Sequence, residues 1–283
     1  MRVDAHQHFW NNEAGDYPWL DRPENAAINC TFGPDMLAPL LGEAGIDRTV
    51  LVQAMDSAKD TESMLVLAAE NAWIGGVVGW VPLDNPDAAG KRLETLLRNT
   101  KFKGVRHLIH EEADPDWVVR DVVIEGLKVL AAMDVPFDVV AVFPNHLKHV
   151  PELAERVPNL RMVIDHLAKP PIKSKAMDDW KQQMVQAAGY PQVYAKVSGL
   201  NTAADWNTWT AQDFEPYIDV AFEHFGANRL MFGSDWPVAT LAGTYRQVWD
   251  ATRQVVARYG PEAELAIFGD TAAQFYRLAG VPS

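Results

Sequence analysis

Eight short runs of β-strand composition recur from one end of the chain to the other, and this repetition constrains the fold more than any other feature. The runs start 24 to 46 residues apart, which leaves room for one helix between each pair. Strands that alternate with helical patterns form parallel βαβ units. The predicted strands are Val3–Phe9, Thr49–Met55, Gly75–Val81, Lys103–Ile109, Phe137–Phe143, Arg161–Leu167, Val193–Gly199 and Arg229–Asp235.

The segments between these strands carry helix signals. Asn85 followed by Pro86 is typical of a capping residue with proline at the first helical position, and it predicts a helix over residues 88–99. Apolar residues at helical spacing predict others with one apolar stripe facing a sheet. These further helices are expected over 61–71, preceded by Asp60, over 120–133 and 244–259, and, packed outside the ring, around 271–278.

Eight strands and eight helices in a chain of this length predict a (β/α)8 TIM barrel that forms a single domain over residues 1–283. An open doubly wound sheet is the rival, but its glycine-rich phosphate turn is missing. Gly75-Gly76 begins a strand and does not lead into a helix. The long stretch Trp10–Gly33 is then an elaborated active-site loop after the first strand, and the chain ends in an extra C-terminal helix.

Charge and composition exclude several classes of protein. The formal net charge is −13 and the basic residues are scattered singly, which argues against nucleic acid as a partner. No apolar run approaches the length of a membrane span, and the N-terminus lacks a signal peptide pattern. A single cysteine fits a reducing compartment, so a cytoplasmic protein is expected. The oligomeric state stays open.

The active site of a (β/α)8 barrel lies where its strands end. His6 and His8 close the first strand, and because they are two residues apart their side chains should point to the same side. Val3, Ala5 and Phe9 are expected on the opposite side, against the helices. An HxH pair of this kind fits either metal ligands or hydrogen-bonded histidines that tie loops down.

Two further residues support a functional site at that end of the barrel. His166 ends the sixth strand and Asp235 ends the eighth. Three imidazoles and a carboxylate that converge suit a metal site, or a site that activates water without metal. Asp235 is then the candidate general base, and the competing interpretation is a structural cap for the next helix.

Other residues near the strand ends are candidates for binding a substrate. Arg106 and His107 are neighbours, so only one of them can face the barrel interior directly. Arg106, Lys196 and Lys169 each fit either a substrate contact or a structural ion pair. The aromatic side chains at or near the rim could stack on the C–H surface of a sugar ring; they are Trp10, Trp19 and Trp236.

In this order along the chain, the strand-end motifs resemble the sugar-lactonase branch of the amidohydrolase superfamily, and within it the L-fuconolactonase and L-rhamnonolactonase types. The resemblance runs from the first strand to the eighth and rests on the set of motifs together. The motifs are His6-Gln7-His8-Phe9-Trp10, Lys103-Gly104-Val105-Arg106-His107, Asp165-His166-Leu167-Ala168-Lys169-Pro170, Lys196-Val197-Ser198-Gly199-Leu200 and Phe232-Gly233-Ser234-Asp235-Trp236-Pro237.

The resemblance implies a TIM-barrel hydrolase that opens the cyclic ester of a sugar acid and uses no organic cofactor. Carried over by position, His6, His8 and His166 would bind a metal ion or polarise the lactone carbonyl, and Asp235 would deprotonate the attacking water or join the metal ligands. The residues that would hold the sugar ring are Arg106 or His107, Lys196 and Trp10.

The chain departs from the metal-rich superfamily pattern at the fifth strand. That strand ends in Ala141-Val142-Phe143-Pro144, with no histidine or lysine. A binuclear centre is therefore not expected, and a single divalent cation of the zinc type is treated as optional.

Two alternatives to a lactonase remain. The first is a metal-dependent, non-oxidative decarboxylase of an aromatic or enoic acid, which the superfamily runs with a similar residue set. The second is a sugar-binding barrel without catalysis, which the filled set of polar strand ends argues against. The partner expected from all of this is a small-molecule sugar lactone.

Overall fold

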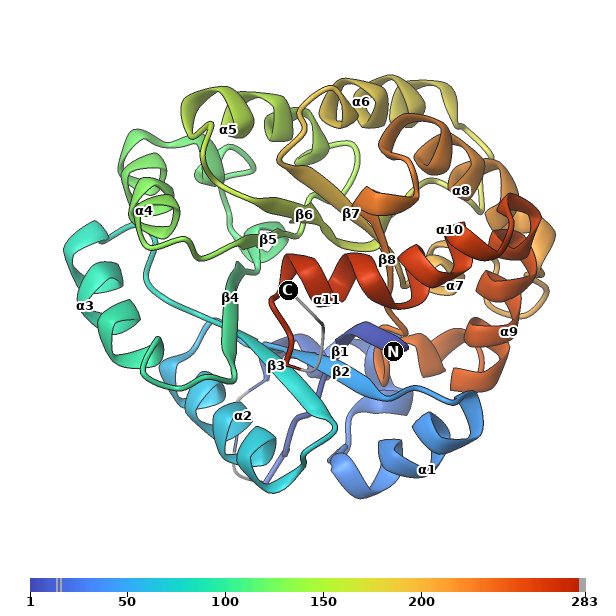
Figure 1. Ribbon diagram of the computed structural model, residues 1–283, viewed down its shortest axis with the longest axis horizontal. Helices are drawn as coiled ribbons and strands as arrows, with labels where there is room; N and C mark the ends of the chain where they lie inside the picture. The colour runs from blue at the N-terminus through green and yellow to red at the C-terminus, as the bar shows by residue number, and fades with distance from the viewer. Residues whose placement is uncertain (14, 16, 280–283) are drawn as a thin grey trace.

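The computed structural model describes residues 1–13, 15 and 17–279, and within them the eight predicted strands form one parallel sheet that closes on itself (Figure 1). Neighbours in sequence are neighbours in the sheet, and Gln7 pairs with Trp236 to join the last strand to the first. The strands are β1 Val3–Gln7, β2 Arg48–Val52, β3 Ile74–Gly79, β4 Phe102–His107, β5 Phe137–Val139, β6 Met162–Ile164, β7 Val193–Val197 and β8 Leu230–Phe232.

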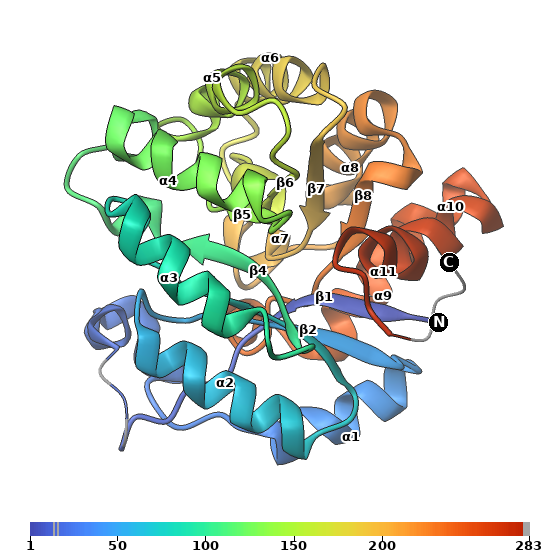
Figure 2. The ribbon, with the colours of Figure 1, turned by 60° about the vertical axis from the view of Figure 1, so that its left-hand side comes forward.

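Helices surround this barrel, and the predicted (β/α)8 fold is confirmed (Figure 2). A π-helical turn, Ala266–Asp270, joins the last two helices, and short 3-10 turns occur in the loops. The α-helices are α1 Pro34–Ala44, α2 Ala58–Glu70, α3 Pro86–Leu96, α4 Asp121–Ala132, α5 Val150–Arg156, α6 Asp178–Ala188, α7 Leu200–Ala203, α8 Ala211–Phe225, α9 Tyr245–Val256, α10 Pro261–Leu265 and α11 Thr271–Phe275.

Helix α3 begins with the capping residue that the sequence predicts, and helix α2 does not. The Asn85 side chain accepts a hydrogen bond from the backbone N–H of Ala88, as the sequence predicts for α3. The cap of α2 is Ser57 instead of Asp60. Asp60 lies inside the first turn. Its carboxylate accepts hydrogen bonds from the backbone N–H of Ala54 and from the hydroxyl of Tyr17.

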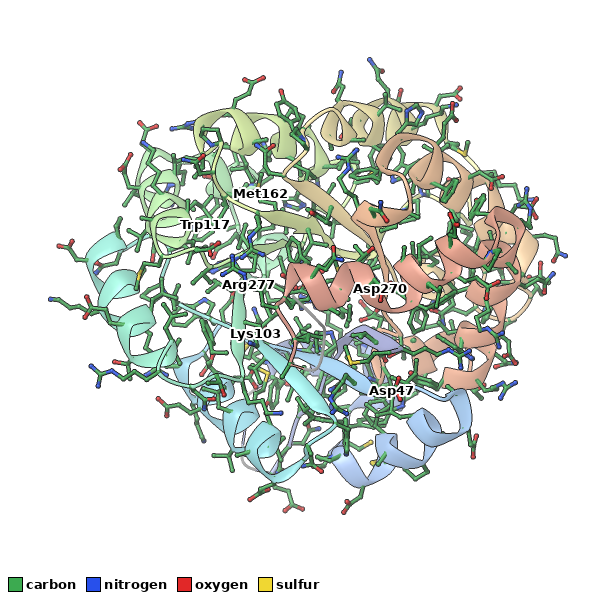
Figure 3. All side chains as sticks on the ribbon, viewed as in Figure 1. Asp47, Lys103, Trp117, Met162, Asp270 and Arg277 are labelled. Carbon is green, nitrogen blue, oxygen red and sulfur yellow. The ribbon has the colours of Figure 1, made fainter. Side chains whose placement is uncertain are left out.

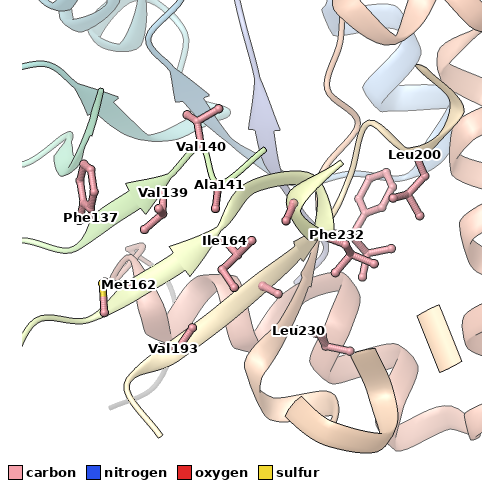
Figure 4. Packing of buried hydrophobic residues seen from close by; sticks show 14 of the residues in the cluster. Phe137, Val139, Val140, Ala141, Met162, Ile164, Val193, Leu200, Leu230 and Phe232 are labelled. Carbon is pink, nitrogen blue, oxygen red and sulfur yellow. The ribbon is translucent and has the colours of Figure 1, made fainter. Parts of the chain in front are cut away.

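The apolar core has two parts. The larger lies between the strands and the helices around them, and Figure 4 shows part of it, where side chains such as Phe137, Val139, Met162 and Ile164 project from β5 and β6. The smaller part fills the barrel interior near the end at which the strands begin. Its members are Val3, Ala5, Val50, Val52, Val78, Val163, Met231, Ala272, Phe275, Tyr276 and Leu278.

The expectation that Val3 and Ala5 face the helices is wrong. The pairing of β1 with β2 shifts register between Asp4 and Gln7, so β1 carries one extra residue there. Ala5 therefore stays inside the barrel although His6, the next residue, also points inward. A register shift of this kind cannot be read from an alternating pattern.

The C-terminal helix α11 closes the end of the barrel at which the strands begin, and in Figure 1 it crosses in front of the strands. The sequence placed this segment outside the ring, but the side chain of Tyr276 enters the interior and is 1% exposed. Lys103, at the start of β4, holds the same segment by donating to the carbonyl of Arg277, and both are labelled in Figure 3. Residues 280–283, which follow this segment, and residues 14 and 16 of the loop after β1 lie outside the described residues.

Among residues 1–13, 15 and 17–279, none of the helices combines the length and the apolar character that a bilayer crossing requires.

Candidate active site

A cavity of about 380 Å³ opens at the barrel end where the strands finish. Its floor carries the side chains of His8, His166 and Asp235, with Arg106 and Lys169 beside them. His6 lies directly beneath and is fully buried. The rest of the wall comes from the loops after β1, β2, β4, β5 and β8 and from α7. These lining residues are Trp19, Arg22, Asn25, Ala54, Leu108, His110, Glu111, Val140, Val142, Thr202 and Val238.

The four residues predicted to converge do so, and we call them the histidine–aspartate cluster: His6, His8, His166 and Asp235. The Nε2 atoms of His6 and His8 are 3.0 Å apart. Oδ1 of Asp235 lies 3.5 Å from Nε2 of His8 and 3.8 Å from Nε2 of both His6 and His166. Oδ1 of Asp235 therefore lies within 3.8 Å of an imidazole nitrogen of each of the three histidines.

Hydrogen bonds on the far side of each ring fix these orientations. Nδ1 of His8 donates to the carbonyl of Val52 at 2.8 Å, which leaves its Nε2 as an acceptor when the ring is neutral. Nδ1 of His166 is 2.8 Å from the hydroxyl of Ser198. Nδ1 of His6 faces the carboxylate of Asp165 at 3.3 Å. This pattern, in which the outer nitrogen is held and the inner one faces the cluster, is typical of metal-binding histidines. Nε2 of His6 also lies 3.1 Å from the guanidinium of Arg106.

The backbone at two of the four residues is unusual. His166 and Asp235 have φ values of 57° and 56°, in the left-handed region that costs a non-glycine residue about 1–2 kcal/mol. Gly199, at φ 58°, makes room for both, because a Cβ there would lie 2.6 Å from Oδ2 of Asp235 and 2.9 Å from Nδ1 of His166. Gly233 does the same for His6, whose Cβ would be 2.5 Å away.

Electrostatics separate the charged from the neutral members. Burial alone would raise the pKa of Asp235, but nearby groups that include the ammonium of Lys169 hold that pKa well below its usual range, so the carboxylate is an anion. Burial lowers the pKa of His166 to about 3 and the pKa of His6 well below its usual value, so both rings are neutral. Oδ2 of Asp235 is buried without a hydrogen-bond partner in the described residues; the ammonium of Lys169 is 3.6 Å away.

Two carboxylates that the sequence left out of the site lie beneath it. Asp165 pairs with Arg106 at 3.0 Å and with Lys196 at 3.1 Å, and Lys196 pairs in turn with Asp138 at 2.6 Å. Burial raises the pKa of Asp165, yet Lys196, His6 and Arg106 hold it well below its usual range. Asp138 faces inward on β5 and Asp165 follows β6. A charged residue that faces the inside of a barrel strand could have indicated from the sequence that both carboxylates belong near the site.

The structure brings some of the expected substrate-binding residues to the cavity and keeps others away. Arg106 and Lys169 line it, which decides between Arg106 and His107. Lys196 is fully buried below His6, 3.0 Å from its Nδ1, and is not among the residues that line this cavity. His107 stacks on Trp117, with ring centroids 4.0 Å apart.

Among the aromatic residues, only Trp19 of the expected three lines the cavity. Trp10 is buried and donates to the carbonyl of Cys30, with Trp19 packed edge-on against it. Trp236 is buried against Phe9 and Phe32. The expectation that Trp10 and Trp236 hold a sugar ring is therefore corrected: their rings are used to pack the loop after β1, because a long loop needs an apolar core of its own.

A second group of metal-capable residues lies beside β4, and we call it the His107 cluster: Asp56, His107 and Glu112. Nε2 of His107 is 2.8 Å from Glu112 and 3.4 Å from Asp56. Its Nδ1 accepts a hydrogen bond from the indole N–H of Trp80 at 3.1 Å. Indole nitrogen only donates, so the ring hydrogen of neutral His107 is on Nε2 and points at the carboxylates.

Comparison with known proteins places this barrel in a family. The amidohydrolase family model matches residues 3–278. The chain belongs to the amidohydrolase family. It is 40% identical to the L-fucono-1,5-lactonase of Burkholderia ambifaria, over 98% of this chain and 96% of that protein, and 36% identical to the L-fucono-1,5-lactonase of Burkholderia multivorans, with the same coverage. An amidohydrolase from Burkholderia multivorans with bound zinc has a TM-score of 0.92 at 35% identity, over 98% of this chain and 99% of that one.

The histidine–aspartate cluster fits such an ion. Zinc bonds of about 2.0–2.1 Å in a tetrahedron place ligand atoms about 3.3–3.4 Å apart. Nε2 of His6, Nε2 of His8 and Oδ1 of Asp235 are 3.0, 3.5 and 3.8 Å from one another, and such nitrogens are borderline ligands that zinc prefers. His6 and His166 form a second group of this kind with Asp165, whose Oδ1 has no hydrogen-bond partner in the described residues. The residues that would hold an ion are thus His6, His8 and Asp235, with His166 and Asp165 in the adjoining group.

Proposed function

We propose that this chain is a sugar lactonase that hydrolyses L-fucono-1,5-lactone or a lactone close to it. The observation that carries the proposal is the ionised carboxylate of Asp235, which lines the open cavity at the barrel mouth beside His8 and His166. A carboxylate anion at the wall of a cavity can accept a proton from a water molecule bound there. Full-length identity of 40% to an L-fucono-1,5-lactonase supports the choice of substrate.

The cavity suits a compact molecule with one polar and one apolar side. Arg106, Lys169 and His110 line the polar side and offer hydrogen-bond donors to ester and hydroxyl oxygens. Val140 and Val142 lie on the apolar side, where the methyl group of a 6-deoxy sugar acid would be excluded from water. A pocket of this size with a few convergent polar groups is typical of small-molecule sites.

The reaction follows from the charges. Asp235 accepts a proton from the water as its oxygen attacks the lactone carbonyl, and the held position of the carboxylate makes this step effectively intramolecular. Negative charge then grows on the carbonyl oxygen. Arg106 and Lys169 are cations already aimed at the cavity, and a single such donor is worth about 3 kcal/mol in the transition state.

Ring opening requires a proton on the departing hydroxyl oxygen. Asp235 carries the proton taken from water and returns it at this step, with the ammonium of Lys169 3.6 Å from the same carboxylate as the second donor. A zinc-type ion held by the histidine–aspartate cluster would add Lewis-acid polarisation of the carbonyl. The neutral state of His6 and His166 is compatible with either arrangement because neutral imidazole is both ligand and hydrogen-bonding group.

Release of acid from a panel of aldono-1,4- and 1,5-lactones, measured with and without a chelator, tests the function. We expect hydrolysis of L-fucono-lactone in preference to lactones that lack the 6-methyl group. The chelator arm shows how much of the rate depends on an ion. Carbon dioxide release from an aromatic acid, without acid release from any lactone, would identify a decarboxylase instead. Sugar binding without turnover would identify a binding protein.

A further inference from the structure

The buried side chains beneath the cavity form a continuous chain of contacts from the C-terminal helix to the floor of the active site. Tyr276 follows α11, and its hydroxyl donates to Oδ2 of Asp138 at 2.7 Å. The same oxygen accepts from the ammonium of Lys196 at 2.6 Å, and Lys196 lies 3.0 Å from Nδ1 of His6. Asp138, Lys196 and His6 are fully buried and Tyr276 is 1% exposed, so no solvent screens these contacts.

We propose that Tyr276 is a positioning residue for the active site, acting through Asp138 and Lys196 on the imidazole of His6. The kinetic consequence of this proposal rests on the proposed lactonase function, whereas the structural consequence does not.

Asp138 depends on its two hydrogen-bond donors, Tyr276 and Lys196. Its Oδ2 takes both hydrogen bonds, and its Oδ1 has no partner in the described residues. Burial raises the pKa of Asp138 to about 6, against the lowering effect of Lys196 and Tyr276. Removal of the Tyr276 hydroxyl takes away one of the two groups that favour the charged carboxylate, and Lys196 then loses part of its anchor.

Lys196 and Arg106 both approach the imidazole ring of His6 as hydrogen-bond donors. Lys196 lies 3.0 Å from Nδ1 of His6, and Arg106 lies 3.1 Å from Nε2 of the same imidazole. Both cations only donate hydrogen bonds, and a neutral imidazole accepts at one nitrogen only. If Asp138 draws the Lys196 hydrogens away from the ring, Nδ1 of His6 keeps its hydrogen and donates to Asp165, and Nε2 faces the cluster as the acceptor.

The hydroxyl of Tyr276 and its ring make different contacts. The ring packs in the interior apolar cluster and lies 5.5 Å from the ammonium of Lys196, measured to the ring centroid. Phenylalanine would keep this packing and the cation–π contact. Only the bond to Asp138 would disappear, so Tyr276→Phe isolates the positioning role from a packing role.

The experiment compares Tyr276→Phe with Tyr259→Phe, which removes a tyrosine hydroxyl that donates to Asp219 on the outer face of the molecule. Each variant is assayed for kcat and KM on the lactone, for Tm, and by 15N NMR of the His6 imidazole, assigned by its loss in His6→Gln. We expect Tyr276→Phe to lower kcat about tenfold with KM within about twofold, as expected for loss of a supporting hydrogen bond, and to change which His6 nitrogen carries the hydrogen. Tyr259→Phe should change neither.

Asp138→Asn tests the same link without altering the helix. It should shift the His6 signals in the same direction, and adding Tyr276→Phe to it should cause no further loss of kcat, because both act through one path. The proposal is overturned if Tyr276→Phe and Asp138→Asn both leave the His6 spectrum as in the parent protein, whatever happens to Tm. If the parent protein hydrolyses no lactone, the proposed function fails, and the His6 spectrum still decides whether Tyr276 is coupled to the site.

Discussion

The histidine–aspartate cluster and the His107 cluster contain the same kinds of side chain at similar spacing, yet their surroundings differ. Each includes at least one histidine and one carboxylate whose ligand atoms lie within 4.8 Å of one another. The first borders the cavity at the barrel mouth. The second lies against Trp117 and Trp80, to one side of the cavity.

The difference lies in the partner of the far ring nitrogen. His8 gives the hydrogen on Nδ1 to a backbone carbonyl, so its Nε2 presents a lone pair. In the His107 cluster the N–H of Trp80 requires a lone pair on Nδ1, so Nε2 carries the hydrogen and is satisfied by Glu112. A search by residue type and distance cannot distinguish the two, whereas a search that follows the hydrogens can.

The largest contrast is expected when one carboxylate of each cluster is made neutral. Asp235→Asn removes the proposed base and should lower kcat/KM for the lactone at least about 1,000-fold, while sugar binding is retained. Asp56→Asn, the matched change in the His107 cluster, should stay within about tenfold. Steady-state hydrolysis and binding of the sugar acid measure both variants. Equal losses in the two would mean that the clusters do not differ as described.

Zinc binding should follow the same division. His6→Gln removes a nitrogen from the histidine–aspartate cluster and is expected to weaken zinc binding at least about 100-fold. His107→Gln should leave affinity and stoichiometry as in the parent chain. Calorimetry on protein freed of metal by a chelator gives both quantities. Loss of zinc binding in His107→Gln, with none in His6→Gln, would reverse the assignment.

A pair of glycines tests how closely the chain fits around the first cluster. Gly199 (φ 58°, ψ 19°) and Gly45 (φ 67°, ψ 37°) are both left-handed, so alanine at either should destabilise the fold by about 1 kcal/mol. A Cβ at Gly45 meets only the end of the Arg2 side chain, whereas at Gly199 it meets Asp235 and His166. Gly199→Ala is therefore expected to lower kcat about tenfold or more, by the displacement of Asp235 and His166, and Gly45→Ala to leave it unchanged. Thermal denaturation confirms that the strain is matched. Equal kcat in the two would show that the fit around Asp235 is loose.

The smallest effect concerns pH. The pKa of Asp235 is held well below its usual range, and burial lowers that of His166 to about 3. Asp235 is thus charged and His166 neutral throughout the range from pH 5 to 8, and protonation of Asp235 would reduce the rate only at more acidic pH. We expect kcat/KM to vary less than about threefold across that range, after subtraction of spontaneous hydrolysis. A steep decline between pH 7 and 5.5 would show that a group of this cluster titrates there.

Much of the fold was predictable from the sequence because strand and helix signals are local. All eight strands were found, although the sequence extended them past their ends, since the residues beyond β5 and β6 look β-prone but turn to build the rim. The extra residue in β1 and the entry of Tyr276 into the barrel were missed. Both depend on contacts between distant segments, which local patterns do not encode.

The residues of the site also fall into those that could be predicted from the sequence and those that could not. His6, His8, His166 and Asp235 were expected to meet because strand ends of a closed barrel must meet. The sequence left the role of Lys196 open between a substrate contact and a structural ion pair, since a lone lysine at a strand end gives no sign of whether it points to the cavity or to a buried carboxylate such as Asp138. Trp10 and Trp236 were misread for a related reason: their large apolar surfaces suit the packing of a loop as well as a sugar ring.

The most direct test of the central claim is a crystal structure of the protein with the hydrolysed sugar acid bound. The account predicts that the new carboxylate lies at the histidine–aspartate cluster, with an oxygen within hydrogen-bond distance of Asp235 or His166 and of Arg106. Binding of the acid elsewhere, for instance against Trp117 and the His107 cluster, with the floor of the cavity left to solvent, would contradict it.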